Sequence, residues 1–119
     1  MITKIESQQI VQAVHGYLEG LQKNNHRKAW KHTQKTWKSN HRKKDLKRYF
    51  FIKPLGSFMV YSIKRKGEAM CDVWVNAEFY IESLKKNKDF HLRVRVLCEK
   101  KPYKPSIEGK WGVNPDSVQ

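Results

Sequence analysis

The chain has 119 residues, of which 39% are hydrophobic and 12% aromatic. This length suits a single domain spanning residues 1–119, and this apolar content excludes a disordered chain and allows a core without disulfides or metal. The formal net charge of +14 is the property most informative about a partner.

The N-terminal segment and the cysteines bear on the compartment. No basic head is followed by an apolar run, and no window holds the ~20 apolar residues that span a bilayer. We therefore expect a protein that is neither secreted nor inserted in a membrane, located in the cytoplasm or within a virion or other large complex. Cys71 and Cys98 lie in alternating apolar runs. A disulfide between them is geometrically possible, but we favour buried free thiols.

Three helices are predicted in the first half of the chain, where apolar residues recur every three or four positions. The first spans residues 6–22 with Ser7 as its N-cap, and the second spans residues 26–38. The third is short, spans residues 41–51 and ends before Pro54, because proline cannot continue a helix. The residues expected to point inward are Ile10, Val14, Tyr17, Leu18, Leu21, Ala29, Trp30, Thr33, Trp37, Leu46, Tyr49 and Phe50.

Beyond Gly56 the apolar residues recur at every second position, which predicts strands over residues 57–64, 71–81 and 90–99 and near Lys110–Val113. One apolar face per strand predicts an antiparallel sheet that is covered on one side. The fold class is therefore α+β, with three N-terminal helices packed on one face of a curved antiparallel sheet of about four strands. The inward strand residues are Cys71, Val73, Val75, Ala77, Phe79, Ile81, Phe90, Leu92, Val94, Val96 and Cys98.

Two segments carry a resemblance to a known superfamily. Residues 17–30, YLEGLQKNNHRKAW, look like a first helix, a short polar turn and the start of a second helix. Residues 108–113, EGKWGV, look like a final strand in which a Trp follows a Gly-Lys turn. With the order of helices and strands, these features resemble the cone-shaped superfamily named after nuclear transport factor 2.

The resemblance implies a fold more than a function, because members of this superfamily include enzymes, ligand-binding domains, secretion-system assembly domains and protein-binding dimers. Its enzymes place carboxylates and a Tyr or His inside the cone. Here the inward strand positions are apolar, and the acids Asp72 and Glu78 fall on the opposite face. No catalytic position is therefore carried over.

The positive charge is concentrated in about a quarter of the chain. Residues 23–53 hold twelve Lys or Arg against Asp45 alone, whereas residues 1–22 have a balance of −1 and residues 54–119 one of +4. Such a concentration attracts a polyanion, because each neutralised phosphate releases counterions. We predict a nucleic-acid or polyanion-binding surface formed by Arg27, Lys28, Lys31, Lys35, Lys38, Arg42, Lys43, Lys44, Lys47 and Arg48.

Helical spacing puts four of these cations along one stripe: Lys28, Lys31, Lys35 and Lys38. The alternative for this stripe is a solvated helix face that serves solubility alone. Trp30 and Trp37 lie on another stripe and would stack on bases if they were exposed. For the charges we favour an anionic partner over solubility alone, and for Trp30 and Trp37 we favour a position in the core.

No catalytic, metal or cofactor site is predicted. His26, His32 and His41 are not joined by Cys or carboxylates at the spacing of a metal site. Neither Cys71 nor Cys98 lies in an obviously electropositive loop that would activate a thiolate. We therefore expect a protein that is not an enzyme and that takes no cofactor.

A second set of residues is expected on the face of the sheet that points away from the core. Aromatic side chains beside Arg are typical of interface cores, and the alternative is a solvated outer face. We predict a homodimer whose interface is formed by Trp74, Tyr80, Arg93 and Arg95. In a two-fold arrangement the arginines would meet acids of the same face, drawn from Asp72, Glu78 and Glu99.

The sequence supports three functional hypotheses. The leading one is a non-catalytic binding or assembly module that engages nucleic acid or an acidic protein surface. The second is a structural subunit of a larger complex, such as a virion or a secretion machine. The third, which rests on the resemblance, is a small-ligand binder or enzyme that uses the interior of the cone, with Tyr17, Tyr49 and Tyr61 lining it.

Overall fold

The structure is a computed structural model. It describes residues 2–23, 25–49, 55–100, 104–106 and 109–118, without the side chains of residues 47–49, 55 and 104.

The first helix, α1 (Lys4–Gln22), begins before the predicted position. Thr3 is its N-cap: the Thr3 hydroxyl accepts from the Glu6 amide at 3.0 Å, and the Glu6 carboxylate accepts from the Thr3 amide at 3.2 Å. This reciprocal capping box satisfies two amides that the first turn leaves unpaired. Ser7, the N-cap expected from the sequence, therefore lies inside the helix.

The helix predicted over residues 26–38 is in fact two short helices, α2 (His26–Lys31) and α3 (Lys35–Ser39). The intervening backbone pairs with the last strand instead. The Val113 amide donates to the His32 carbonyl, and the Gln34 amide donates to the Val113 carbonyl, both at 2.8 Å. Thr33 and Val113 thus form a parallel bridge. Because the His32 carbonyl and the Gln34 amide are hydrogen-bonded to Val113, neither group is available to continue the helix.

The third predicted helix, over residues 41–51, is a 3-10 helix, η1 (Lys43–Tyr49). The Arg42 amide donates to the Asp45 carboxylate at 2.8 Å, and the Asp45 amide donates to the Arg42 carbonyl at 2.9 Å. Leu46 is fully buried, as expected. The side chain of Tyr49 and all of Phe50 lie outside the described residues.

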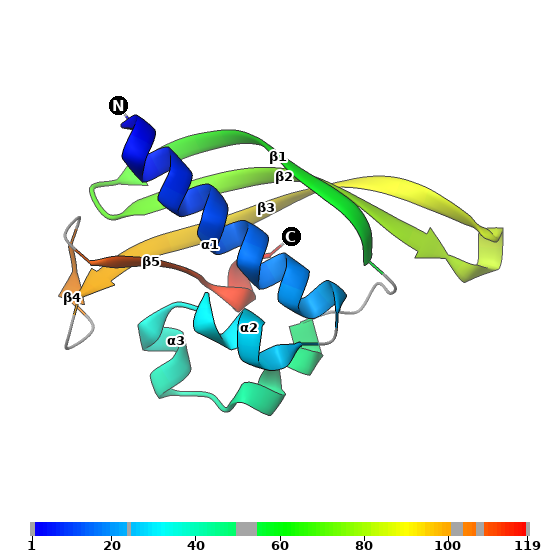
Figure 1. The fold of residues 1–119 in the computed structure, drawn as a ribbon, viewed down its shortest axis with the longest axis horizontal. Coiled ribbons are helices and arrows are strands. Elements are labelled where there is room, and N and C mark those ends of the chain that lie inside the picture. The colour runs from blue at the N-terminus through cyan, green and yellow to red at the C-terminus, as the bar shows by residue number, and fades with distance from the viewer. Residues whose placement is uncertain (1, 24, 50–54, 101–103, 107–108, 119) are drawn as a thin grey trace.

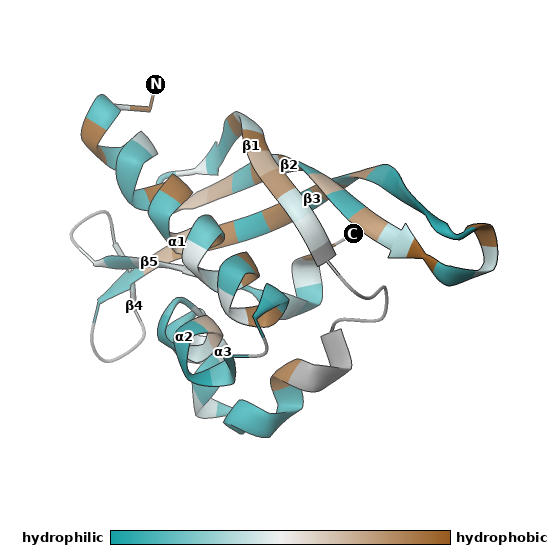
Figure 2. Ribbon diagram, turned by 45° about the vertical axis from the view of Figure 1, so that its right-hand side comes forward, coloured by the Kyte–Doolittle hydropathy of each residue, from teal (hydrophilic) through white to brown (hydrophobic). Residues whose placement is uncertain are grey.

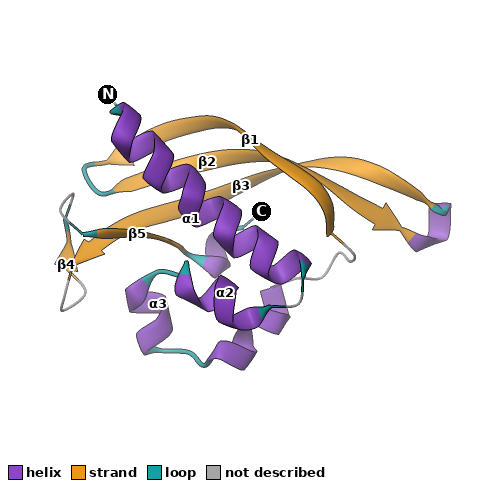
Figure 3. Ribbon diagram, viewed as in Figure 1, coloured by secondary structure: helices purple, strands orange, loops and turns teal. Residues whose placement is uncertain are grey.

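The strands follow the predicted order. They are β1 (Leu55–Gly67), β2 (Met70–Ile81), β3 (Lys86–Lys100), the two-residue β4 (Lys104–Pro105) and β5 (Lys110–Val113). All pairs are antiparallel; β2 lies between β1 and β3, and both β4 and β5 pair with β3. The predicted α+β class, with helices in the N-terminal part and a curved antiparallel sheet, is confirmed (Figure 3).

The connection between the strands predicted over residues 71–81 and 90–99 is shorter than their spacing indicates. It consists of a single 3-10 turn, η2 (Glu82–Leu84), followed by Lys85 in the left-handed conformation at φ 52°. Strand β3 therefore starts at Lys86, and the β2–β3 hairpin forms an arm that extends beyond the helices (Figure 1).

The core lies between α1 and the sheet. Alternate β2 residues are buried as predicted, and the fully buried side chains from α1 include Ile10, Val14, Tyr17 and Leu18. Both cysteines are free and fully buried, which confirms the preferred reading. Burial raises the pKa of each thiol.

Helix α1 crosses one face of strands β1–β3, as Figure 1 shows. The segments α2, α3 and η1, called here the helical lobe (residues 26–46), lie beside β5 at the end of α1. In the part of the chain that is described, no helix combines the length and apolar character needed to cross a membrane.

The parallel bridge depends on Gly112. A Cβ atom at this position would lie 2.8 Å from the Gln34 amide nitrogen and Cα. We expect Gly112→Ala to lower the free energy of unfolding by about 1–3 kcal/mol, because backbone must shift to admit the methyl group. Urea denaturation measures the loss. Gly67→Ala is the matched control, since a Cβ there meets only the Met70 side chain at 3.9 Å. Equal loss in both variants would contradict this role for Gly112.

Candidate functional site

The helical lobe carries most of the charge predicted to bind a polyanion. Figure 2 shows its ribbon coloured largely as hydrophilic. Lys28, Lys35 and Lys38 are half-buried, and the side chains of Lys47 and Arg48 lie outside the described part. The exposed cations are Arg27, Lys31, Arg42, Lys43 and Lys44.

Lys28 has a structural role within this set. Its ammonium group contacts the carboxylate of Glu19 on α1, which joins α2 to α1. Lys23 and His15 approach the same carboxylate, each at 3.7 Å. The hydrogen bond from Lys28 is the main reason that the pKa of Glu19 lies below its usual range. Lys28 is therefore partly neutralised within the chain.

The two tryptophans form an aromatic cluster at the base of the lobe. Trp37 is buried, as expected; its ring meets Trp30 edge-on at 6.2 Å and stacks on His41 at 3.9 Å. Trp30 is only half-buried, and the Lys38 ammonium lies 5.9 Å from the centre of its ring. The Trp37 ring is therefore not free to stack on a base, whereas the Trp30 ring is only partly covered.

The predicted lysine stripe is not continuous, because residues 32–34 separate α2 from α3. The bridge gathers charge in another way, by bringing Lys110 of β5 to the end of α2. The Lys110 ammonium donates to the Lys31 carbonyl at 3.3 Å. Lys110 also lowers the pKa of both His32 and Lys38, after the larger effect of burial on each. The sequence did not predict Lys110 as part of this site, because only the long-range pairing of residues 32–34 with β5 brings Lys110 to the end of α2.

The outer face of the sheet carries the second predicted site. Arg95 is half-buried and binds the Asp72 carboxylate through Nε at 2.8 Å, with a second bond at 3.3 Å. This pairing holds the pKa of Asp72 below its usual range. The short turn η3 (Pro115–Ser117) lies against the pair, since the Ser117 hydroxyl accepts from the Arg95 amide at 2.9 Å. Asp72, expected at the surface, is in fact 1% exposed.

Glu99 was also expected on the outer face, and it is buried too. Its carboxylate accepts from the Gln34 side-chain amide at 3.2 Å and from the Thr36 amide and hydroxyl at 3.2 and 2.5 Å. These donors lie at the start of α3. Asp72 and Glu99 are therefore committed within the chain and are not available to a partner's arginines.

Trp74 and Arg93 face each other across β2 and β3 and are half-buried, while Tyr80 lies farther along the arm and is 37% exposed. Two large side chains on β1 that the sequence did not assign to this face are exposed. They are Met59, which is 64% exposed, and Tyr61, which is 51% exposed. Tyr61 follows Met59 by two residues, and the alternation of a strand places both side chains on one face. The Tyr61 hydroxyl lies 3.2 Å from Nδ1 of His91.

Comparison with known proteins adds no family to this geometry. A scan against protein-family models and a search of curated proteins both found no match to the chain.

Proposed function

We propose that this protein is a non-catalytic binding module that engages nucleic acid through its helical lobe. The observation that carries the proposal is the placement of charge. Five exposed Arg or Lys side chains lie on the lobe, and Asp45 is the one acid in the sequence from residue 23 to residue 53. Asp45 caps the backbone of η1. A surface of this kind neutralises several phosphates at once, and the released counterions supply the affinity.

The mode of binding follows from the tryptophans. Because Trp37 is buried under Trp30 and His41, and Trp30 is half-buried beside Lys38, we expect base stacking to contribute little. Contacts to the phosphate backbone then dominate, and such contacts carry no direct sequence information. We therefore expect weak preference among sequences and a steep dependence on salt. An acidic protein surface is the competing partner, and the binding assay below separates the two.

The absence of catalysis is part of the proposal. Its support is the apolar character of the inner strand face, where Cys71, Val73 and Val75 are fully buried. The raised pKa of the Cys71 and Cys98 thiols disfavours the thiolate that a cysteine nucleophile requires. Tyr61, one of three tyrosines considered for an interior pocket, lies on the opposite face beside His91.

Removing charge from the lobe tests the function. We expect the triple variant Arg42→Gln, Lys43→Gln, Lys44→Gln to weaken binding to random DNA and RNA by about tenfold or more at low salt. Each lost phosphate contact should also reduce the slope of log K against log salt by ~0.9 for duplex DNA. Fluorescence anisotropy across a salt series measures both quantities.

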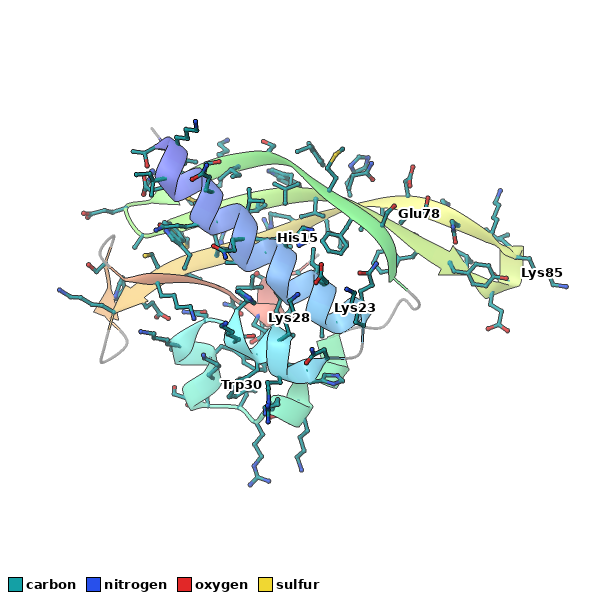
Figure 4. All side chains as sticks on the ribbon, in the orientation of Figure 1. His15, Lys23, Lys28, Trp30, Glu78 and Lys85 are labelled. Carbon is teal, nitrogen blue, oxygen red and sulfur yellow. The ribbon has the colours of Figure 1, made fainter. Side chains whose placement is uncertain are left out.

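The matched control removes the same charge from the arm, through Lys85→Gln, Lys86→Gln and Lys88→Gln. These lysines are exposed, and Figure 4 shows Lys85 at the far end of the hairpin from Lys28 and Trp30. The control should bind as the unmodified protein does. Failure of the unmodified protein to bind either nucleic acid at low ionic strength would exclude the proposal and leave an acidic protein as the partner to test.

We further infer that the chain is a divergent member of the superfamily named after nuclear transport factor 2. What supports this is the order of its elements, in which N-terminal helices precede an antiparallel sheet and Trp111 lies in the final strand. A cytoplasmic location, or one inside a large nucleoprotein assembly such as a virion, belongs to the same proposal.

A homodimer built on the outer sheet face is a second proposal, and it rests on exposed apolar groups there. Met59 and Tyr61 add to Trp74 on this face, and contiguous apolar area of this kind marks contact sites. In the part of the chain described, Nε of Arg93 is buried without a hydrogen-bond acceptor. With Asp72 and Glu99 committed, Glu78 is the remaining one of the three predicted acids for a two-fold pair with Arg93. Such pairs contribute only ~0.2–1 kcal/mol, so apolar burial has to supply most of the affinity.

Sedimentation equilibrium at micromolar concentration tests the dimer. We expect Tyr61→Glu and Arg93→Glu each to shift the protein toward monomer, because the first places a charge in the apolar contact and the second makes like charges meet. Ile5→Glu is the control, since Ile5 is 68% exposed on α1 and lies outside the proposed interface. A monomeric unmodified protein, or a dimer indifferent to both variants, would show that this face is simply solvated.

A further inference from the structure

We infer that the groove between α1, the end of α2 and the start of β5 is a phosphate-binding subsite. This inference deepens the proposed function and rests on it for the source of the phosphate, which is the backbone of a nucleic acid. The groove has a volume of about 280 Å³. The residues that line it include Gln9, Gln12, Lys31, His32 and Lys110.

The residues that line the groove carry donor groups and come from three separate elements. Lys31 and His32 come from the end of α2, Lys110 from β5, and the carboxamides of Gln9 and Gln12 from α1. Lysine ammonium groups bind phosphate as point charges, and neutral amide and imidazole groups add hydrogen bonds to its oxygens. A tetrahedral oxyanion in the groove would therefore accept from several directions.

No acid competes for these lysines in the described residues. Lys31 and Lys110 each lack a carboxylate within ion-pair distance there, in contrast to Lys28, which pairs with Glu19. Glu99 is opposite Lys110 in the strand register, but its carboxylate accepts from Gln34 and Thr36. The two ammonium groups are thus left with positive charge that an anion can neutralise.

Carbonyl groups without hydrogen-bond donors at the end of α2 would repel an anion. The last carbonyls of α2 all accept hydrogen bonds. The Ala29 carbonyl accepts from the His32 amide at 3.1 Å, and the Trp30 carbonyl accepts from the Thr33 amide at 3.1 Å. The Lys31 carbonyl accepts from Lys110, and the His32 carbonyl accepts from Val113. The groove therefore presents donors rather than acceptors at this helix end.

The His32 ring is held in place at the edge of the groove. A Cβ atom on Gly16 would collide with the imidazole, so the ring lies directly against the backbone of α1. His32 also lines a second groove, of about 500 Å³, together with His15 and Lys28. Burial lowers the pKa of His32, and nearby ammonium groups lower it further: those of Lys110, Lys31, Lys28 and Lys38. An anion bound among these groups favours the imidazolium, so binding must raise the pKa of His32.

The His32 ring resonances in an NMR titration report on this site directly. The probes are inorganic phosphate and sulfate, with chloride at equal ionic strength as the reference. Sulfate does not titrate near neutral pH, so any shift it causes belongs to the protein. We expect a saturable change that raises the pKa of His32 with either oxyanion, and we expect the affinity for sulfate to increase as the pH falls.

Lys31→Gln and Lys110→Gln should each weaken the oxyanion response at least fivefold. Each should also raise the pKa of His32 in chloride, because each removes a neighbouring cation that lowers it. Lys44→Gln is the control, because it removes an exposed lysine of the lobe outside the groove. Lys31→Gln keeps the test valid should Lys110→Gln disturb β5, since the Lys31 side chain is exposed. A response equal to that in chloride, or equal losses in Lys31→Gln and Lys44→Gln, would overturn the inference.

The same variants in the nucleic-acid assay separate this inference from the proposed function. Larger losses for Lys31→Gln and Lys110→Gln than for Lys44→Gln would support a subsite for backbone phosphate. Binding of nucleic acid with equal losses in all three, and no oxyanion response, would overturn the subsite and leave the proposed function intact. A saturable oxyanion response without nucleic-acid binding would support the subsite for free phosphate and overturn the proposed function.

Discussion

The pairing of residues 32–34 with Val113 organises the end of this protein that carries the proposed binding surface. Two backbone hydrogen bonds of 2.8 Å connect a segment near the N-terminus to the last strand, about eighty residues later. The bridge ends α2, starts α3 and holds the helical lobe against the sheet. It also sets Lys110 against the carbonyl of Lys31. The charge surface and the groove beside it both depend on this pairing, and Gly112 allows the two backbones to approach each other.

Stability and charge are supplied by different groups in the lobe. Buried Ala29, Trp37 and Leu46 anchor it to the rest of the chain, so the exposed cations are not needed to hold it in place. These cations repel one another, but under the proposed function the same concentration of positive charge attracts an anion. Lys28 is the exception, because its pairing with Glu19 joins α2 to α1. This division explains why neutral substitutions at exposed lysines can test binding without unfolding the domain.

The sequence predicted what local periodicity determines and missed what distant pairing determines. Alternation identified the inner face of β2, the buried free thiols and the last strand at Lys110–Val113. The break between α2 and α3 was not predicted, because residues 26–38 have a helical pattern and the competing hydrogen bonds come from β5. The burial of Asp72 and Glu99 was not predicted either, because it depends on distant partners. Asp72 binds Arg95, and Glu99 binds Gln34 and Thr36. Within the candidate site, the basic segment could be predicted, whereas Lys110 and the groove could not.

The central claim is that two segments far apart in the sequence form one anion-binding surface. Amide hydrogen exchange, followed by mass spectrometry with and without a saturating oligonucleotide, tests it most directly. The account predicts added protection in both residues 26–46 and residues 109–113, with the tip of the arm at Glu82–Lys88 unchanged. Protection confined to the arm or to the outer sheet strands, with the lobe and β5 unchanged, would contradict it.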